Sequence, residues 1–405
     1  MSALAKNKKT AKLPVSVITG FLGSGKTTLL NYILSAHHGK RIAVIENEFG
    51  EVGIDDALVK QKFKEDEEIF EMNNGCICCT VRGDLIRILK QLSAHKNKFD
   101  YVLIETTGLA DPAPVAQTFF VDEEIEKMYQ LDGIITVCDV KHLLIHLDEE
   151  KAEGVENESV EQVAFADVIL FNKTDLVSAD ELATVKAKVT AINKSAKTFD
   201  TQHSVVDLEK ILNIGAFDLQ RILTGLDPQF LVDQEHQHDQ TVSSVGVIFD
   251  GELAIFELQA WISELMQTKG TDLFRYKGIL AVKGEDRKYV FHGVHMLFGG
   301  SFLEEKWTAQ EKRTCKFIFI GRNLDREFLE NGFKECAAKP LQFNVGDKVF
   351  ANVEGGWTEA TVLKLWNDGN AYRLKLLAGK NKGVEVFAPI DHNQFIRKTK
   401  PADDE

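Results

Sequence analysis

Two patterns of apolar and polar residues alternate along the first half of the chain. Short runs of β-branched and other apolar residues are separated by longer stretches whose apolar residues recur at helical spacing. The runs that predict buried strands lie at 13–19, 41–45, 101–104, 133–138 and 168–171. Strands that alternate with helices are typical of an α/β fold, so we expect a doubly wound, mostly parallel sheet.

The second half of the chain predicts two smaller units. Between 242 and 335, strands are expected at 245–249, 278–282, 289–294 and 316–320, and helices at 252–267 and 325–331, which indicates an α+β domain. Between 341 and 398, short strands at 348–352, 357–365, 371–376 and 383–388 are typical of a small SH3- or Tudor-like β-barrel. We therefore expect a disordered N-terminus at 1–12, an α/β domain at 13–226, a linker at 227–241, and these two units.

The segment after the first expected strand has the pattern of a phosphate-binding loop. Residues 20–27 match G-x-x-x-x-G-K-[ST] and lie between a strand and a helix, which is the context that a P-loop requires. Its backbone N–H groups and the helix N-terminus bind phosphate, Lys26 reaches the β- and γ-phosphates, and Thr27 holds Mg²⁺. The residues expected around the triphosphate are Gly20, Gly23, Ser24, Gly25, Lys26, Thr27 and Thr28.

A later strand ends in residues suited to guanine. Residues 172–175 read N-K-T-D, and the carboxylate of Asp175 is placed to accept hydrogen bonds from N1–H and the 2-amino group of guanine. Adenine lacks this donor pair, so the pattern favours GTP and argues against the rival interpretation, an ATP-dependent kinase or ATPase. The residues expected to bind guanine are Asn172, Lys173 and Asp175.

The strand at 101–104 ends in an acid. Glu105 is followed by a loop that contains Gly108, and we expect its carboxylate to act on Mg²⁺ or to orient the attacking water. Together with Lys26 and Thr27 it forms the expected catalytic set, which argues against a scaffold with a dead site.

Three of the six cysteines lie within four positions, at Cys76, Cys78 and Cys79. Thiolates are soft ligands that suit Zn²⁺, and less firmly Co²⁺ or Ni²⁺. Three sulfurs leave a tetrahedral site one ligand short, which is typical of a reactive or transfer site rather than of a closed structural one. Three buried thiols or a redox pair are the alternatives, although adjacent Cys78 and Cys79 are poorly placed for an unstrained disulfide.

Several residues are candidates for a further metal ligand. Glu46 and Glu51 follow the second expected strand, where they would touch Mg²⁺ or complete the thiol site. His142 and His146 stand four residues apart on an expected helix, which is a spacing that zinc ligands use and that surface histidines also reach by chance. Two histidines of the expected linker are weaker candidates, His236 and His238.

The composition bounds the partners and the compartment. A net charge of −14 argues against non-specific nucleic-acid binding, although residues 341–400 hold 9 Lys and Arg against 6 Asp and Glu. No apolar run approaches the ~20 residues that span a bilayer, and residues 1–12 have no apolar core typical of a secretory signal. We expect a reducing compartment, the cytoplasm, with the nucleus left open.

These motifs, in this order, resemble the CobW-like GTPases, the group of zinc-regulated GTPase metalloprotein activators and related metal chaperones. The resemblance covers about residues 13–335 and includes E-N-E-F-G-E at 46–51, N-G-C-I-C-C at 74–79, E-T-T-G-L-A-D-P at 105–112, R-Y-K-G at 275–278, G-V-H at 293–295 and F-I-G-R-N at 319–323. It implies a slow GTPase that binds GTP or GDP with Mg²⁺, holds Zn²⁺ at the thiol cluster and delivers it to a client metalloenzyme. A metal-sensing or buffering module that recruits a partner is the alternative.

The chain departs from the family pattern at both ends. Residues 1–14 contain no Cys, so the Cys-Pro docking motif of some eukaryotic members is not carried over, and the long His tracts of other members are missing. The expected barrel lies outside the resemblance. Its rings at Trp357, Trp366 and Tyr372 would either form a cage for a protein or peptide ligand or fill a small core.

Overall fold

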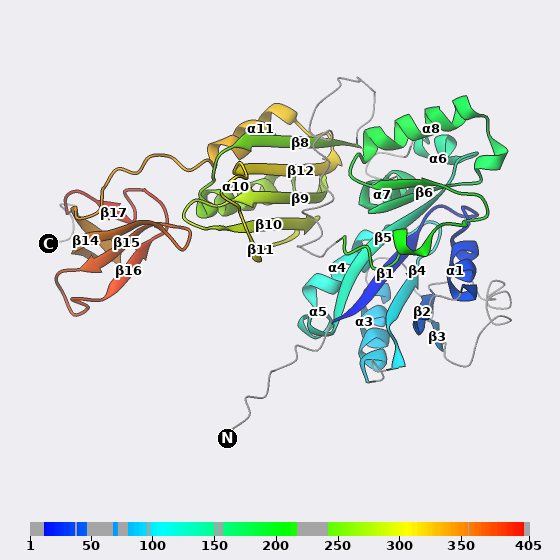
Figure 1. Cartoon of the computed structure of the whole chain (residues 1–405), viewed down its shortest axis with the longest axis horizontal. Coiled ribbons are helices and arrows are strands. Elements are labelled where there is room, and N and C mark those ends of the chain that lie inside the picture. Colours follow the sequence, from blue (N-terminus) through cyan, green and yellow to red (C-terminus); the bar gives the residue numbers. More distant parts are fainter. Residues whose placement is uncertain are drawn as a thin grey trace. The chain divides into compact units, whose positions relative to one another are not determined.

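The computed structural model describes residues 12–36, 39–46, 68–71, 80–94, 98–149, 151, 157–216, 242–354 and 356–400. These residues fall into two compact units, one built mainly from the chain up to Ser244 and the other mainly from Val245 onward. Figure 1 shows the elements of each unit. No helix within the described ranges is long and apolar enough to cross a bilayer.

The first unit is built on a parallel sheet whose described strands follow the order β3-β2-β4-β1-β5-β6-β7 (Figure 1). Their bounds are β1 Leu13–Thr19, β2 Ile42–Glu46, β3 Glu68–Glu71, β4 Tyr101–Glu105, β5 Tyr129–Asp139, β6 Val168–Asn172 and β7 Lys197–Asp200. All five strands that the sequence predicts in this unit are confirmed. The edge strands β3 and β7 were missed because each has only four residues and neither contains a long apolar run.

Helices cover both faces of this sheet. Their bounds are α1 Lys26–Ser35, α3 Thr80–Ser93, α4 Ala113–Val121, α5 Glu123–Met128, α6 Leu143–Leu147, α7 Glu158–Phe165 and α8 Ala179–Ile192, with 3₁₀ turns at η3 Thr174–Leu176 and η4 Leu208–Lys210. Successive residues of a strand point to opposite faces, and Val102, Leu103 and Ile104 of β4 are all fully buried. Burial on both faces is typical of a doubly wound sheet, so the predicted fold class is confirmed.

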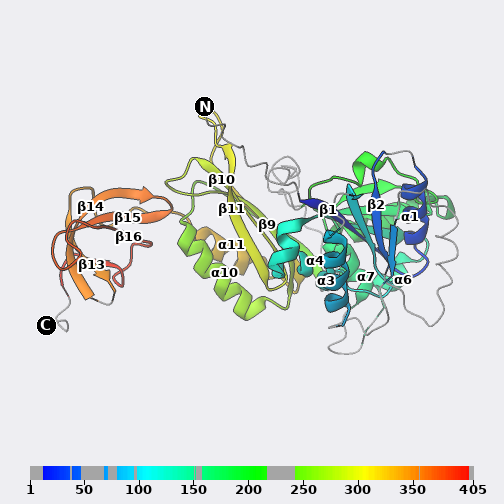
Figure 2. The same cartoon turned by 90° about the horizontal axis from the view of Figure 1, so that it is seen from below.

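The second unit begins with a five-stranded sheet of order β11-β10-β9-β12-β8 in the described part of the chain. Its elements are β8 Val242–Asp250, α10 Ile255–Lys269, β9 Leu273–Ala281, β10 Arg287–Val294, β11 Leu297–Lys306, β12 Thr314–Arg322 and α11 Arg326–Glu335. Figure 2 shows α10 and α11 on one face of this sheet, where Leu258 and Phe333 pack into its apolar core. The α+β prediction is confirmed, but β11 was missed because it is a largely exposed edge strand with adjacent Gly299 and Gly300.

A further antiparallel sheet, of order β16-β15-β14-β13-β17, follows in the described residues. Its strands are β13 Lys348–Val353, β14 Gly356–Asn367, β15 Asn370–Leu376, β16 Glu385–Ala388 and β17 Ile396–Arg397. The four strands predicted here are confirmed, and β17 is an additional one. Closure of this sheet into a barrel stays a prediction.

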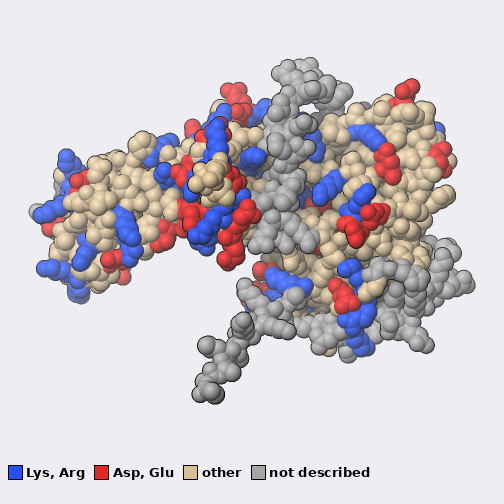
Figure 3. All heavy atoms as spheres, viewed as in Figure 1, with Lys and Arg blue, Asp and Glu red and all other residues tan. Residues whose placement is uncertain are grey.

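The three candidate cage rings of this sheet do not share an open cage. Tyr372 is fully buried and Trp366 packs against the same apolar core. The guanidinium of Arg397 lies over the Trp357 ring, 4.8 Å from its centroid. Tyr372 and Trp366 therefore fill the core, as the second interpretation of the sequence expects, whereas Trp357 lies under Arg397 outside that core. Figure 3 shows Lys and Arg together with fewer Asp and Glu over the visible face of this sheet, and basic and acidic groups interspersed over the α+β part. In the α+β part, Lys288 pairs with Glu305 and Glu311.

Candidate functional site

The loop between β1 and α1 has the backbone conformation of a phosphate cradle. Gly20, Gly23 and Gly25 have φ values of 138°, 73° and 111°, which side chains rarely tolerate. A Cβ added at Gly25 would lie 2.5 Å from Asn172 Nδ2, and one at Gly20 would lie 2.2 Å from the Val137 carbonyl oxygen. At both positions a side chain would clash with its neighbours and would also be strained by the positive φ.

The start of α1 is suited to an anion. Gly25 is the N-cap residue, no side chain caps the helix, and its first turn holds no acid. Its N–H groups and the positive end of its dipole therefore face the loop. The Lys26 ammonium donates to the carbonyl oxygens of Gly20 at 2.8 Å and Phe21 at 3.3 Å. Lys26 therefore lies against the backbone of the loop; its contact with the phosphates stays a prediction.

Acids gather at the carboxyl edge of the sheet. Thr27 Oγ1 donates to Glu105 Oε1 at 3.0 Å, which joins the first turn of α1 to the end of β4. Glu46 is the register partner of Glu105 on β2, and Glu71 is the register partner of Glu46 on β3. The backbone therefore brings three strand-end acids side by side, next to the P-loop.

The predicted guanine residues lie on the other side of the P-loop. Asn172 ends β6 with only 2% of its surface exposed, and its Nδ2 donates to the Ser24 carbonyl oxygen at 2.9 Å. The ammonium of Lys173 donates to the Gly23 carbonyl oxygen at 2.8 Å and to Asp139 Oδ2 at 2.7 Å. Asp175 lies in the following 3₁₀ turn, η3, and is exposed.

Electrostatics favour the ionised form of Asp139. Partial burial opposes ionisation, but hydrogen bonds from Lys173, from His142 and from the Lys141 N–H outweigh it. The pKa of Asp139 therefore lies below its ordinary value, and the Lys173 ammonium is paired with a carboxylate at neutral pH.

Sequence reasoning missed the residues that hold Asn172. Thr201 Oγ1 and the Ser204 N–H donate to Asn172 Oδ1 at 3.1 and 2.9 Å, and Asn172 Nδ2 donates to Ser204 Oγ at 3.0 Å. Ser204 Oγ also donates to the Gly25 carbonyl oxygen at 3.0 Å. Thr201 and Ser204 flank a loop after β7 that the sequence signals only weakly, through small polar residues after an edge strand.

The loop after Glu105 is tied to the sheet and to α7. The Thr106 N–H donates to the Ile18 carbonyl oxygen at 3.0 Å, and Asp111 Oδ1 accepts from the Ala113 N–H at 2.8 Å. Gln162 Nε2 donates to the carbonyl oxygens of Gly108 and Ala110, each at 3.1 Å. The loop that is expected near the γ-phosphate is thus fixed at its start, middle and end.

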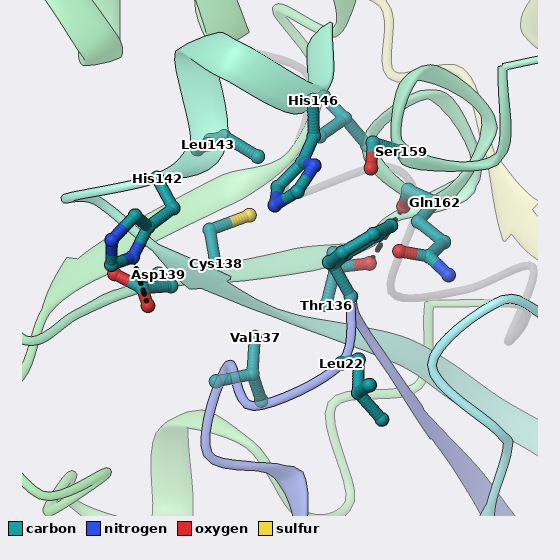
Figure 4. Close-up of a pocket in the computed structure, with 12 residues that line it drawn as sticks. Leu22, Thr136, Val137, Cys138, Asp139, His142, Leu143, His146, Ser159 and Gln162 are labelled. Atoms are coloured by element: carbon teal, nitrogen blue, oxygen red, sulfur yellow. Dashed lines mark hydrogen bonds and ion pairs between the residues drawn. The ribbon is translucent and has the colours of Figure 1, made fainter.

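The two histidines proposed as ligands contact different partners. His142 is the N-cap residue of α6 and its Nδ1 lies 3.0 Å from Asp139 Oδ2, whereas His146 stacks on the Phe21 ring with centroids 3.7 Å apart. Both line a cavity of about 70 Å³ beside the P-loop, together with Cys138 (Figure 4). Burial, and to a lesser extent Asp139, raises the pKa of Cys138 to about 12, which disfavours its thiolate form.

The predicted metal site can be placed only in part. Cys76, Cys78, Cys79, Glu51, His236 and His238 lie outside the described residues. In the part of the chain that the structure describes, no group of three His, Cys, Asp or Glu side chains is arranged to hold a metal, so His142 gains no such partners. The described strand β3 ends at Glu71, five residues before Cys76, and five residues span at most about 18 Å.

Comparisons with known proteins agree with this arrangement. The family described as the CobW/HypB/UreG nucleotide-binding domain matches residues 14–200, and the cobalamin synthesis protein CobW C-terminal domain matches residues 242–337. The zinc chaperone YjiA of Escherichia coli is 36% identical over 79% of this chain and 98% of its own length. Zinc-regulated GTPase metalloprotein activator 1 of Schizosaccharomyces pombe is 34% identical over 78% of this chain and 83% of its own length.

Solved structures match over the same part of the chain. The zinc-bound YjiA GTPase of Escherichia coli and a zinc-bound triple mutant of YjiA each share 30% identity with this chain. Each comparison covers 81% of this chain and all of the solved chain, with TM-scores of 0.63 and 0.64.

Proposed function

The chain belongs to the CobW family of GTPases, and from this premise we propose that it is a metal chaperone that holds zinc at Cys76, Cys78 and Cys79 and releases it to a client metalloenzyme after GTP hydrolysis. The observation that carries the proposal is the sheet edge where Glu46, Glu71 and Glu105 end adjacent strands. One of these strands leads within five residues to the thiol cluster, and another contacts the P-loop.

The described residues suit the binding of GTP. The α1 N-terminus and the Gly20–Gly25 cradle present N–H groups to phosphate, and Lys26 supplies the charge. Asn172, held by four hydrogen bonds, joins the guanine side to the P-loop, and Asp175 is open to the N1–H and 2-amino donors of guanine. We propose that these groups select GTP over ATP.

The residues on the Thr27 side fit Mg²⁺. The Thr27 hydroxyl and the Glu105 carboxylate lie 3.0 Å apart. Mg²⁺ prefers such hard oxygen ligands. We propose that both groups hold the ion, directly or through water. When bound, Mg²⁺ supplies charge that offsets the negative charge of the phosphates. Glu105 also stands at the end of β4 beside Gly108, where its carboxylate orients the attacking water.

Zinc enters this proposal as cargo. Three thiolates supply three soft ligands, and Glu46 or Glu51 is proposed as the fourth. The segment between Glu46 and Cys76 follows β2 and includes β3, so it begins at the edge that also holds Glu105. Loops that order around a γ-phosphate relax after hydrolysis, and a change of one ligand is enough to weaken a tetrahedral zinc site.

A single substitution tests the assignment of the cargo site. Cys78→Ser removes one soft ligand from the cluster and leaves every described nucleotide contact in place. We expect the variant to bind GDP and a non-hydrolysable GTP analogue like the parent and to lose tight zinc, measured by equilibrium dialysis and metal analysis. Cys138→Ser, on a buried thiol outside the cluster, is the matched control and keeps zinc. Equal zinc affinity in the Cys78→Ser variant and the parent would refute the site.

A further inference from the structure

We propose that Gln162 is a positioning residue of the GTPase, which sets the orientation of the loop after Glu105 through its side-chain amide. The inference rests on the GTPase activity of the family and concerns a residue outside the motifs that the sequence analysis identified. Gln162 lies in α7, and its hydrogen bonds join it to Gly108, Ala110 and Thr136 rather than to the P-loop glycines or the guanine residues.

The side-chain amide of Gln162 makes two hydrogen bonds to one loop. The Gln162 side chain is almost fully buried, with 1% of its surface exposed, and its Nε2 donates to two carbonyl oxygens of one loop, Gly108 and Ala110, each at 3.1 Å. In Figure 4 its side chain lies beside Thr136, at the cavity next to the P-loop. Since one amide holds two carbonyl groups that are two residues apart, the loop cannot rotate either peptide without breaking a buried hydrogen bond.

The hydrogen bond from Gln162 fixes the direction of the peptide group between Gly108 and Leu109, in the loop that is expected near the γ-phosphate. A trans peptide is planar, so its C=O and N–H groups point in opposite directions. Because the Gly108 carbonyl points to Gln162, the N–H of Leu109 points away from it. Gly108 also lies against the P-loop, since a Cβ added to it would be 2.6 Å from the Leu22 nitrogen. The loop is thus held between Gln162 on one side and the P-loop backbone on the other.

The helix that presents Gln162 is itself held at both ends. At its start, the Asn157 side chain accepts from the N–H groups of Ser159 and Val160 at 3.0 and 3.1 Å. At its C-terminal end, Asn193 Nδ2 donates to the carbonyl oxygens of Val163, Ala164 and Ala166 at 2.9 to 3.1 Å. Thr136 Oγ1 of β5 donates to the Gln162 carbonyl oxygen at 2.7 Å. The amide therefore acts from a rigid support rather than from a mobile side chain.

The first test removes the two donated hydrogen bonds and keeps the size of the side chain. Gln162→Met is an unbranched replacement without a donor, and Gln91→Met, on an exposed position of α3, is the matched control. We expect the kcat of GTP hydrolysis to fall roughly 10- to 100-fold in Gln162→Met, because a misplaced loop no longer meets the γ-phosphate. The affinity for GDP, which has no γ-phosphate, stays at the parental value, and the control matches the parent in both.

The second test separates orientation from packing. A carboxylate in Gln162→Glu has no proton to donate to the two carbonyl oxygens, whereas a protonated carboxyl group donates one hydrogen bond. Burial raises the pKa of such a carboxyl group, so the kcat of this variant relative to the parent should rise as the pH is lowered from 8 to about 6. Gln162→Met should show no such rise.

Three outcomes would overturn the inference. The first is a parental kcat in Gln162→Met, and the second is an equal loss of GTP and GDP binding in that variant. The third is a ratio of the Gln162→Glu kcat to the parental kcat that does not change with pH. If Gln162→Met does not fold, the pH dependence of the Gln162→Glu kcat relative to the parental kcat still tests the inference. Absence of GTP hydrolysis in the parent would instead contradict the GTPase assignment, so the two failures are distinguishable.

Discussion

Asn172 gives the most quantitative prediction about the nucleotide site. Its side chain donates to the Ser24 carbonyl oxygen and to Ser204 Oγ, and it accepts from Thr201 Oγ1 and the Ser204 N–H. These bonds join β6, the loop after β7 and the P-loop, and the side chain is only 2% exposed. Asn172→Ala removes all four hydrogen bonds, so the donor and acceptor atoms that Asn172 contacts lose this partner.

The expected cost follows from these contacts. Four buried hydrogen bonds at about 1 kcal/mol each amount to about 4 kcal/mol of unfolding free energy. For a unit of this size, that is a fall in Tm of roughly 8 to 16 °C. GDP at 100 times its Kd should stabilise the parent by about 2.7 kcal/mol and should stabilise the variant far less.

Thermal unfolding with and without GDP measures both effects. Circular dichroism gives the Tm, and fluorescence titration with a labelled GDP gives the affinity. Asn381→Ala, at an exposed position of the turn between β15 and β16, is the control and should change neither. A Tm within about 2 °C of the parent, which corresponds to less than 1 kcal/mol, together with unchanged GDP affinity, would show that the Asn172 network contributes nothing measurable.

Two further substitutions test the acids of the site. Glu105→Gln should lower the kcat of GTP hydrolysis roughly 100-fold and leave the GDP affinity measured without Mg²⁺ unchanged, because its carboxylate acts on water or Mg²⁺ rather than on the base; a parental kcat would refute this role. Asp139→Asn should remove the pairing with Lys173. The folded-state pKa of Asp139 lies below its unfolded value. The contribution of its ionised carboxylate to the unfolding free energy is therefore complete above about pH 4 and is lost as the pH falls through the folded pKa. The difference in unfolding free energy between parent and variant, measured in urea from pH 7 to pH 3, should therefore shrink with acid; a constant or growing difference would contradict the pairing.

The parts that the sequence predicts best have local signatures. The P-loop needs glycines at positive φ between a strand and a helix, and Gly20, Gly23 and Gly25 occupy these conformations. The buried strands of a doubly wound sheet are short apolar runs, so β1, β4 and β6 were found within one residue of their ends.

The parts that the sequence misses depend on contacts between distant residues. Gln162 meets Gly108 across 54 residues, and Ser204 meets Gly25 across 179. A glutamine on a helix and a serine after a four-residue edge strand have no distinctive local pattern, because their partners are backbone carbonyl groups. The helical spacing of His142 and His146 was equally uninformative, since α6 begins after His142 and the two rings contact different groups.

The central claim is that hydrolysis of GTP controls the release of zinc. The most direct measurement is the rate of zinc transfer from the loaded full chain to an excess chelator, followed by stopped-flow absorbance with GTP, with a non-hydrolysable GTP analogue and with GDP. We predict slow transfer with the analogue, faster transfer with GTP at a rate set by hydrolysis, and a return to the analogue rate in Glu105→Gln. Equal transfer rates with all three nucleotides would contradict it and would favour a metal-sensing or buffering role.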